Sequence, residues 1–67
     1  MWKVIYIAPT QEYAEKLKKL LLDNGFLCQL KPVGSRRGSK LVSIEISVPE
    51  SEAEDAYEVL AEHGFRG

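Results

Sequence analysis

Residue types that carry catalytic and metal chemistry are scarce in this chain of 67 residues, which has one cysteine and one histidine. A single cysteine excludes an intramolecular disulfide framework and the zinc motifs built on several cysteines. No apolar stretch approaches the roughly 20 residues that cross a bilayer, and no segment has the pattern of a signal peptide. The sequence therefore predicts one small cytoplasmic domain, residues 1–67, with no cofactor, no metal and no membrane contact.

An excess of charge of one sign is also lacking, since 9 basic and 10 acidic residues give a net charge of −1. The charges are unevenly distributed, however. Residues 41–67 carry seven acidic residues against Arg66 alone, and the positive charges lie before them. A nucleic-acid-binding domain normally shows a basic excess, so this distribution disfavours nucleic acid as a partner.

The first half of the chain predicts a strand followed by a helix. The β-branched and aromatic residues of Trp2–Ala8 are typical of a strand, which Pro9 ends. Thr10 is a good N-cap for a helix from about Gln11 to Asn24. Gly25 can adopt the left-handed conformation that ends such a helix.

Two further strands and a second helix follow. Alternation predicts strands at Phe26–Lys31 and Leu41–Val48. Pro32 lacks an N–H group, so the first of these strands should lie at a sheet edge or end there. Ser51 and Glu54 have the spacing of a capping box at the start of a helix. Its expected apolar stripe comprises Ala53, Ala56, Tyr57 and Leu60.

The order β-α-β-β-α predicts an α+β sandwich of the ferredoxin-like kind. Its three-stranded antiparallel/mixed sheet has the third strand in the centre, antiparallel to both neighbours, and both helices on one face. Residues 65–67 form either a short fourth strand or a docked tail, and the sequence leaves both alternatives open.

The first strand is apolar on both faces, so two orientations stay open. If Ile5 and Ile7 face the helices, then Trp2, Val4 and Tyr6 lie on the open face and form a candidate contact surface. In the opposite register, those three residues belong to the core.

Several polar residues are expected to have structural roles. Cys28 lies between apolar residues of its strand, which favours a buried thiol over a nucleophile. His63 stands at a helix C-terminus, where an imidazole interacts well with the helix dipole. The acidic residues from Glu50 to Glu62 are expected to form a solvated helix face, or to pair in part with the basic first helix.

The most suggestive segment for binding is the short loop between the second and third strands. Its glycines and serines expose backbone amides, and its three basic side chains suit phosphate or carboxylate groups. The candidate residues are Gly34, Ser35, Arg36, Arg37, Gly38, Ser39 and Lys40.

Several stretches carry a family resemblance: the opening Met-Trp-Lys-Val-Ile-Tyr-Ile-Ala-Pro, the Leu-Leu-Leu-Asp-Asn-Gly-Phe segment, the basic loop, and Val-Ser-Ile-Glu-Ile-Ser-Val-Pro-Glu-Ser-Glu. The chain resembles a family of small bacterial proteins of unknown function, which are described as signal-transducing proteins with a PII-like (GlnB-like) fold. The resemblance implies a ferredoxin-like domain and, by analogy, a regulatory role. PII proteins place a long effector loop where residues 34–40 lie, but this loop is much shorter, so nucleotide binding is not implied.

Similar small chains are also labelled glutamate decarboxylase, which the residues do not support. That reaction needs pyridoxal phosphate on a lysine inside a pocket, and a chain of this length has no room for one. The leading hypothesis is therefore a non-catalytic regulatory or adaptor module that binds a protein partner or a small anionic ligand through residues 34–40 and the open sheet face.

Two alternatives belong to other classes. An RNA-binding sheet platform needs aromatic residues on its central strands, whereas the third strand presents Ser43, Glu45 and Ser47. A homodimeric small-molecule sensor would form its cleft between two copies joined through the open sheet face.

Overall fold

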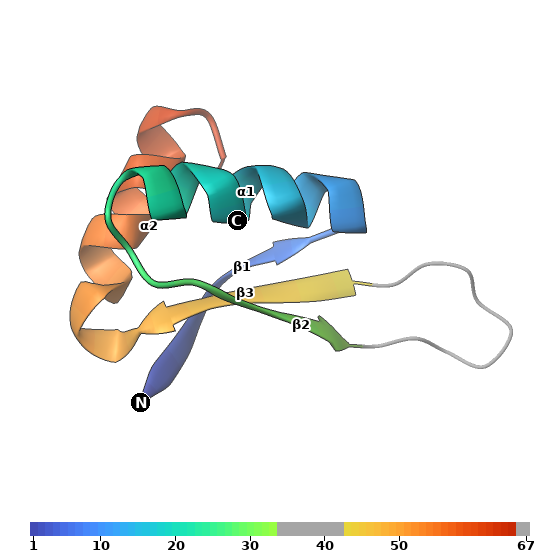
Figure 1. The fold of residues 1–67 in the computed structure, drawn as a ribbon, viewed down its shortest axis with the longest axis horizontal. Coiled ribbons are helices and arrows are strands. Elements are labelled where there is room, and N and C mark those ends of the chain that lie inside the picture. Colours follow the sequence, from blue (N-terminus) through green and yellow to red (C-terminus); the bar gives the residue numbers. More distant parts are fainter. Residues whose placement is uncertain (34–42, 66–67) are drawn as a thin grey trace, which may run out of the picture.

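The computed structural model describes residues 1–33 and 43–65 of the chain (Figure 1). Along the sequence it contains β1 (Trp2–Ala8), α1 (Gln11–Asp23), β2 (Gln29–Val33), β3 (Ser43–Pro49), the short 3₁₀ helix η1 (Glu50–Glu52) and α2 (Ala53–Glu62). The predicted order of strands and helices is confirmed.

The three strands form one sheet in the order β1-β3-β2, and β3 pairs antiparallel with both neighbours. Both helices lie on the same side of this sheet (Figure 1). The predicted central position of the third strand is therefore confirmed. In the part of the chain that the structure describes, the opposite face of the sheet is uncovered.

The core lies between the helices and β3. Ile44, Ile46 and Val48 alternate along β3 and are almost completely buried, as are Leu17 of α1 and Leu60 of α2. This alternation places the apolar side chains of β3 on the helix side of the sheet. Each such side chain contributes about 1.5–3 kcal/mol of transfer free energy on burial.

A β-bulge divides β1 into two parts that face in different directions. Val4 lies opposite Ser47 and Tyr6 lies opposite Ile46, so Ile5 is an extra residue in the pairing. An extra residue reverses the alternation of side chains. Trp2 and Val4 therefore lie on the uncovered face, whereas Tyr6 faces the helices. Neither uniform register is right, and the prediction that Tyr6 joins the open-face surface is wrong.

The second strand begins later than predicted. The backbone N–H of Phe26 donates to the Leu21 carbonyl at 2.9 Å, so Phe26 completes the end of α1 instead of starting a strand. The strand then continues through Pro32 to Val33. The edge position predicted from Pro32 is confirmed, because β2 is the outer strand of the sheet.

The two helix starts differ from each other. Thr10 caps α1 as predicted, and its hydroxyl accepts from the Tyr13 N–H at 3.0 Å. The predicted capping box at Ser51 and Glu54 is wrong. The Glu50 N–H donates to the Met1 carbonyl at 2.8 Å, and η1 then takes Ser51 into a helical turn before α2 begins. The N-cap position of α2 is Glu52, whose side chain makes no cap hydrogen bond.

Gly64 and Phe65 end α2 and return the chain to the core. Gly64 has a φ of 87°, and the Phe65 N–H donates to the Leu60 carbonyl at 2.8 Å. The Phe65 ring meets the Tyr13 ring edge-on, with 5.5 Å between centroids. Phe65 is thus docked and belongs to no strand, whereas residues 66–67 lie outside the described part.

Ile46→Ala should lower the free energy of unfolding by about 2–5 kcal/mol, because it leaves a cavity in a fully buried position. The matched control is Ile7→Ala, at a position 56% exposed, where the expected loss is below about 1 kcal/mol. Urea unfolding followed by circular dichroism measures both. Equal losses would contradict the orientation of β1 and β3.

Candidate functional site

The uncovered face of the sheet carries exposed apolar residues along β1. Trp2, Val4 and Ile7 are 49%, 42% and 56% exposed, and we call these three residues the apolar strip. Leu27, which precedes β2, is 62% exposed. The structure thus places two of the three predicted contact residues, Trp2 and Val4, on this face. It adds Ile7, which the bulge turns outward.

The rest of this face is polar. In the cross-strand rows, Val4 lies opposite Ser47, which lies opposite Gln29 on the other side. Glu45 stands between Ile7 and Lys31 in the same way. Among the described residues of β3, this face therefore carries the Glu45 carboxylate and serine hydroxyls, of which that of Ser47 is largely buried. The exposed apolar side chains borne by a strand lie along β1.

Tyr6 has a structural partner on the helix side. Its hydroxyl and that of Tyr13 lie 3.2 Å apart, and the two rings stack with 6.0 Å between centroids. The hydrogen bond with Tyr13, then burial and the nearby phenols of Tyr13 and Tyr57, raise the pKa of Tyr6. Tyr6 is therefore protonated near neutral pH and has no character of a general base.

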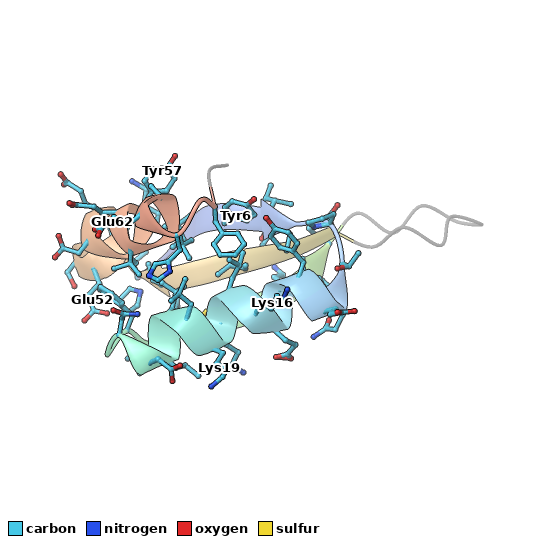
Figure 2. The ribbon with its side chains drawn as sticks, turned by 90° about the horizontal axis from the view of Figure 1, so that it is seen from above. Tyr6, Lys16, Lys19, Glu52, Tyr57 and Glu62 are labelled. Carbon is cyan, nitrogen blue, oxygen red and sulfur yellow. The ribbon has the colours of Figure 1, made fainter. Side chains whose placement is uncertain are left out.

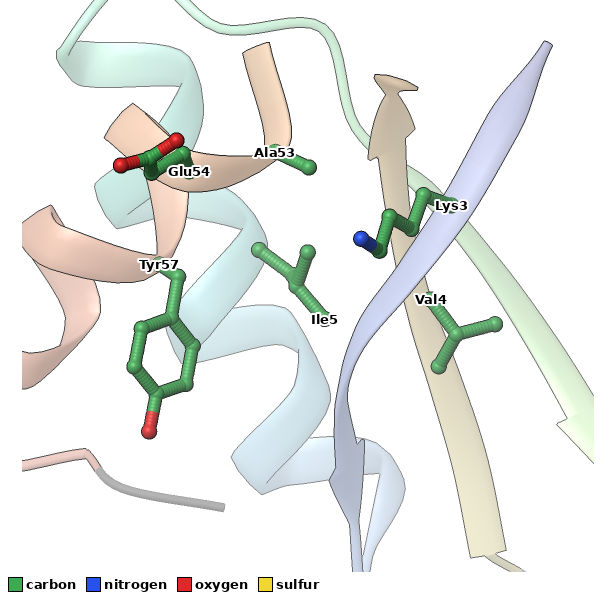
Figure 3. A pocket seen from close by; sticks show the side chains of 6 residues that line it. All are labelled: Lys3, Val4, Ile5, Ala53, Glu54 and Tyr57. Atoms are coloured by element: carbon green, nitrogen blue, oxygen red, sulfur yellow. The ribbon is translucent and has the colours of Figure 1, made fainter. Parts of the chain in front are cut away.

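A hollow of about 380 Å³ lies between β1 and α2 (Figure 3). Lys3 and Ile5 extend from β1 toward the helix, and Tyr57 forms part of the helix wall. Ala53 and Glu54 of α2 and Val4 of β1 complete the lining. Lys3 brings an ammonium group and Ile5 an apolar side chain to the hollow, whereas the carboxylate of Glu54 is turned away from Lys3 (Figure 3).

A second hollow of about 340 Å³ continues along the same strand, lined by Val4, Ile5, Tyr6 and Ile7. Val4 and Ile5 line both hollows, so the two are adjacent along β1, and we call them together the β1 groove. Sequence reasoning missed Lys3, Glu54 and Tyr57 as lining residues. The sequence does contain a signal for Tyr57, because this residue shares the apolar stripe of its helix with two alanines and a leucine. Among such short side chains, the phenol of Tyr57 is long enough to extend beyond the core.

The acidic helix and the basic helix do not pair in the described residues. There, the ion pair lies within α1, with Lys19 Nζ 3.5 Å from the Asp23 carboxylate. Lys19 on α1 and Glu62 on α2 point away from each other (Figure 2). The exposed acids of α2 are solvated, and His63 is the C-cap residue of α2 through its backbone N–H.

The predicted loop site, Gly34 to Lys40, lies entirely outside the described residues. Within residues 1–33 and 43–65, no three His, Cys, Asp or Glu side chains come together as a metal ion requires. None of the helices described is both long and apolar enough to cross a membrane. Comparisons with protein-family models, curated proteins and solved structures give no match.

Cys28 is half-buried beside the core. Burial raises the pKa of its thiol, Lys18 lowers it and Glu15 raises it, with burial the largest effect. We therefore expect the folded protein to react with iodoacetamide more slowly than the urea-unfolded protein at pH 7.5, because the thiolate fraction is smaller. A reaction rate that rises at lower pH in the folded protein than in urea would contradict this assignment.

Proposed function

We propose that this protein is a non-catalytic regulatory or adaptor module that binds a protein partner through the uncovered face of its sheet. The observation that carries the proposal is the apolar strip, Trp2, Val4 and Ile7, which is exposed on one strand and faces no helix in the described structure. Clustered exposed apolar residues typically mark interaction sites, and Trp is among the residues that contribute most to protein interfaces.

The arrangement of strands and helices supports the same proposal. The order β1-β3-β2 with both helices on one face is what a ferredoxin-like sandwich without its last strand would show. We extend the proposal to that fold and to the regulatory role implied by the PII-like resemblance. Fold alone does not define function, so the exposed surface carries the argument.

A protein partner accounts for this face better than RNA does. A sheet that binds single-stranded RNA stacks bases on aromatic residues of its central strands. Here the described part of β3 presents Ser43, Glu45 and Ser47, and a carboxylate in that position repels phosphate groups.

The basic loop enters the proposal from its sequence alone. Arg36, Arg37 and Lys40 provide three positive charges in a chain whose net charge is −1. We propose that this loop contacts acidic groups of the same partner, which would raise the rate of association. A small anionic ligand at the loop is the second form of this hypothesis.

Site-specific photo-crosslinking tests the apolar strip in living cells. A photoreactive phenylalanine analogue at Trp2 should give a discrete adduct with another protein, and adding Ile7→Ser should remove most of that adduct. The matched control position is Leu22, which is 47% exposed on α1 and is not expected to give it. The same adduct from position 22, an adduct between two copies of this chain alone, or none from position 2 would each contradict the proposal.

A charge comparison tests the loop. Replacing Arg36, Arg37 and Lys40 by alanine should lower the crosslink yield from position 2 by about tenfold, since steering charges are lost. The control replaces Lys16, Lys18 and Lys19 of α1 by alanine, which removes the same total charge. Equal losses in the two variants would show a general charge effect and would overturn the assignment to the loop.

A further inference from the structure

The two edges of the sheet differ in their capacity to accept another strand. The outer edge of β2 contains Pro32, which lies opposite Ile44 and has no N–H group to donate. Proline on an edge strand is a common protection against pairing with other chains. In contrast, β1 has seven residues without proline and exposes the apolar strip. Of these two edges, β1 is free of proline, and its part before the bulge, from Trp2 to Val4, is open to pairing.

The ladder between β1 and β3 shows which backbone groups face outward. The Met1 carbonyl accepts from the Glu50 N–H at 2.8 Å, and Trp2 lies opposite Pro49, which has no N–H. Antiparallel pairs alternate between hydrogen-bonded and non-hydrogen-bonded positions. The N–H and C=O groups of Trp2 and Val4 therefore point away from β3, and no described strand lies on that side.

The β1 groove is where a strand paired with this edge would lie. Its two hollows, of about 380 and 340 Å³, run along β1 from Lys3 to Ile7, with α2 as the other wall of the first. A neighbouring strand would lie about 4.8 Å from β1. Its side chains would alternate between the helix side, beside Tyr57 and Glu54, and the side of the apolar strip (Figure 3).

The charge of the helix wall indicates the chemistry of such a strand. Four acidic residues lie on α2 with no lysine or arginine, and the described segment 43–65 contains seven acids and neither basic type. Among the residues that the structure describes, Lys3 is the one basic residue that lines the first hollow. The four acids of α2 outweigh the single ammonium group of Lys3, so this wall has a net negative charge. A lysine or arginine on the incoming strand would complement that charge, and electrostatic complementarity of this kind selects partners.

We propose that the outer edge of β1 accepts an extended segment of the protein partner as an added strand, in which basic side chains facing α2 alternate with apolar side chains beside the apolar strip. This inference rests on the proposed function and adds the site and the partner's chemistry. Strand addition combines main-chain hydrogen bonds with side-chain selection at alternate positions.

A second copy of the chain fits this edge less well. Pairing β1 with β1 of another copy about a two-fold axis brings the same surface of both copies together. The α2 helix flanks β1, so two acidic helices would then lie across the joined edge from each other. Like charges brought together in this way oppose association.

The direct test uses ¹⁵N-labelled protein and a synthetic peptide of alternating lysine and valine. At saturating peptide, the exchange of the Val4 amide with solvent should slow by about tenfold or more, because it gains a hydrogen bond. The Leu30 amide is the internal control, because alternation places it on the outer side of β2, where no change is expected. A peptide of alternating glutamate and valine should bind at least about tenfold more weakly.

Three variants separate the effect of the α2 charge from that of the β1 edge. Glu54→Lys should weaken lysine–valine peptide binding by about tenfold, whereas Asp55→Lys, next in sequence on α2 and outside the groove lining, should change it little. Val4→Pro should abolish binding by removing the outward N–H. Because proline can also destabilise β1, the charge pair keeps the proposal testable if that variant does not fold.

Several outcomes would overturn the proposal. Equal binding of the two peptides, or equal effects of Glu54→Lys and Asp55→Lys, would exclude the role of charge. Chemical-shift changes confined to the open face, with no change in the exchange of the Val4 amide, would exclude pairing at the edge. Dimerisation of the protein through β1 without peptide would show that the edge pairs with a second copy. If any of these is found while photo-crosslinks from Trp2 still identify a partner, the strand-addition site is wrong and the adaptor function stands. If both the expected peptide binding at β1 and the photo-crosslink from Trp2 are absent, both proposals are wrong.

Discussion

The pairing of β1 with β3, interrupted by one extra residue at Ile5, determines which surfaces this protein presents. With regular alternation continued from Trp2 and Val4, Tyr6 would face outward and Ile7 inward. The bulge reverses that assignment, so that Tyr6 faces the helices and Ile7 joins Trp2 and Val4 on the uncovered face. One inserted residue thus supplies both an aromatic contact in the interior and the apolar strip outside.

Tyr6, which the bulge turns toward the helices, also affects the β1 groove. Tyr6 stacks on Tyr13, and Tyr13 meets Phe65 edge-on at 5.5 Å. Aromatic pairs of this kind each contribute about 0.5–1.5 kcal/mol beyond burial. Phe65 lies three residues after the last residue of α2 and donates its N–H to the Leu60 carbonyl, so this cluster anchors the C-terminal end of the helix whose first turns line the β1 groove. Moving Tyr6 outward would therefore disturb the wall of the groove as well as the strip.

Much of the fold was predictable because its signals are local. The alternation along β3, the cap at Thr10 and the turn at Gly25 each depend on residues close in sequence, and all three were predicted correctly. The bulge was not predictable, because β1 is apolar on both faces and periodicity cannot reveal one inserted residue. The start of β2 and the capping box failed because the Leu21 carbonyl engages Phe26 and the Met1 carbonyl engages Glu50. The Phe26 bond is local and belongs to the helix end at Gly25, a signal that the strand alternation outweighed, whereas the Met1–Glu50 bond joins residues far apart in the sequence.

The candidate site shows the same difference between local signals and contacts that depend on the fold. Trp2 and Val4 were found from hydrophobicity alone, whereas Lys3, Glu54 and Tyr57 become neighbours only when α2 lies against β1. A chain of this size buries only about 60% of the surface that its unfolded form exposes, so a strand added at β1 would enlarge the core and satisfy backbone groups at once. Binding of that kind stabilises the folded state in proportion to occupancy. The open edge is therefore both where this small sheet is least complete and where a partner would stabilise it most.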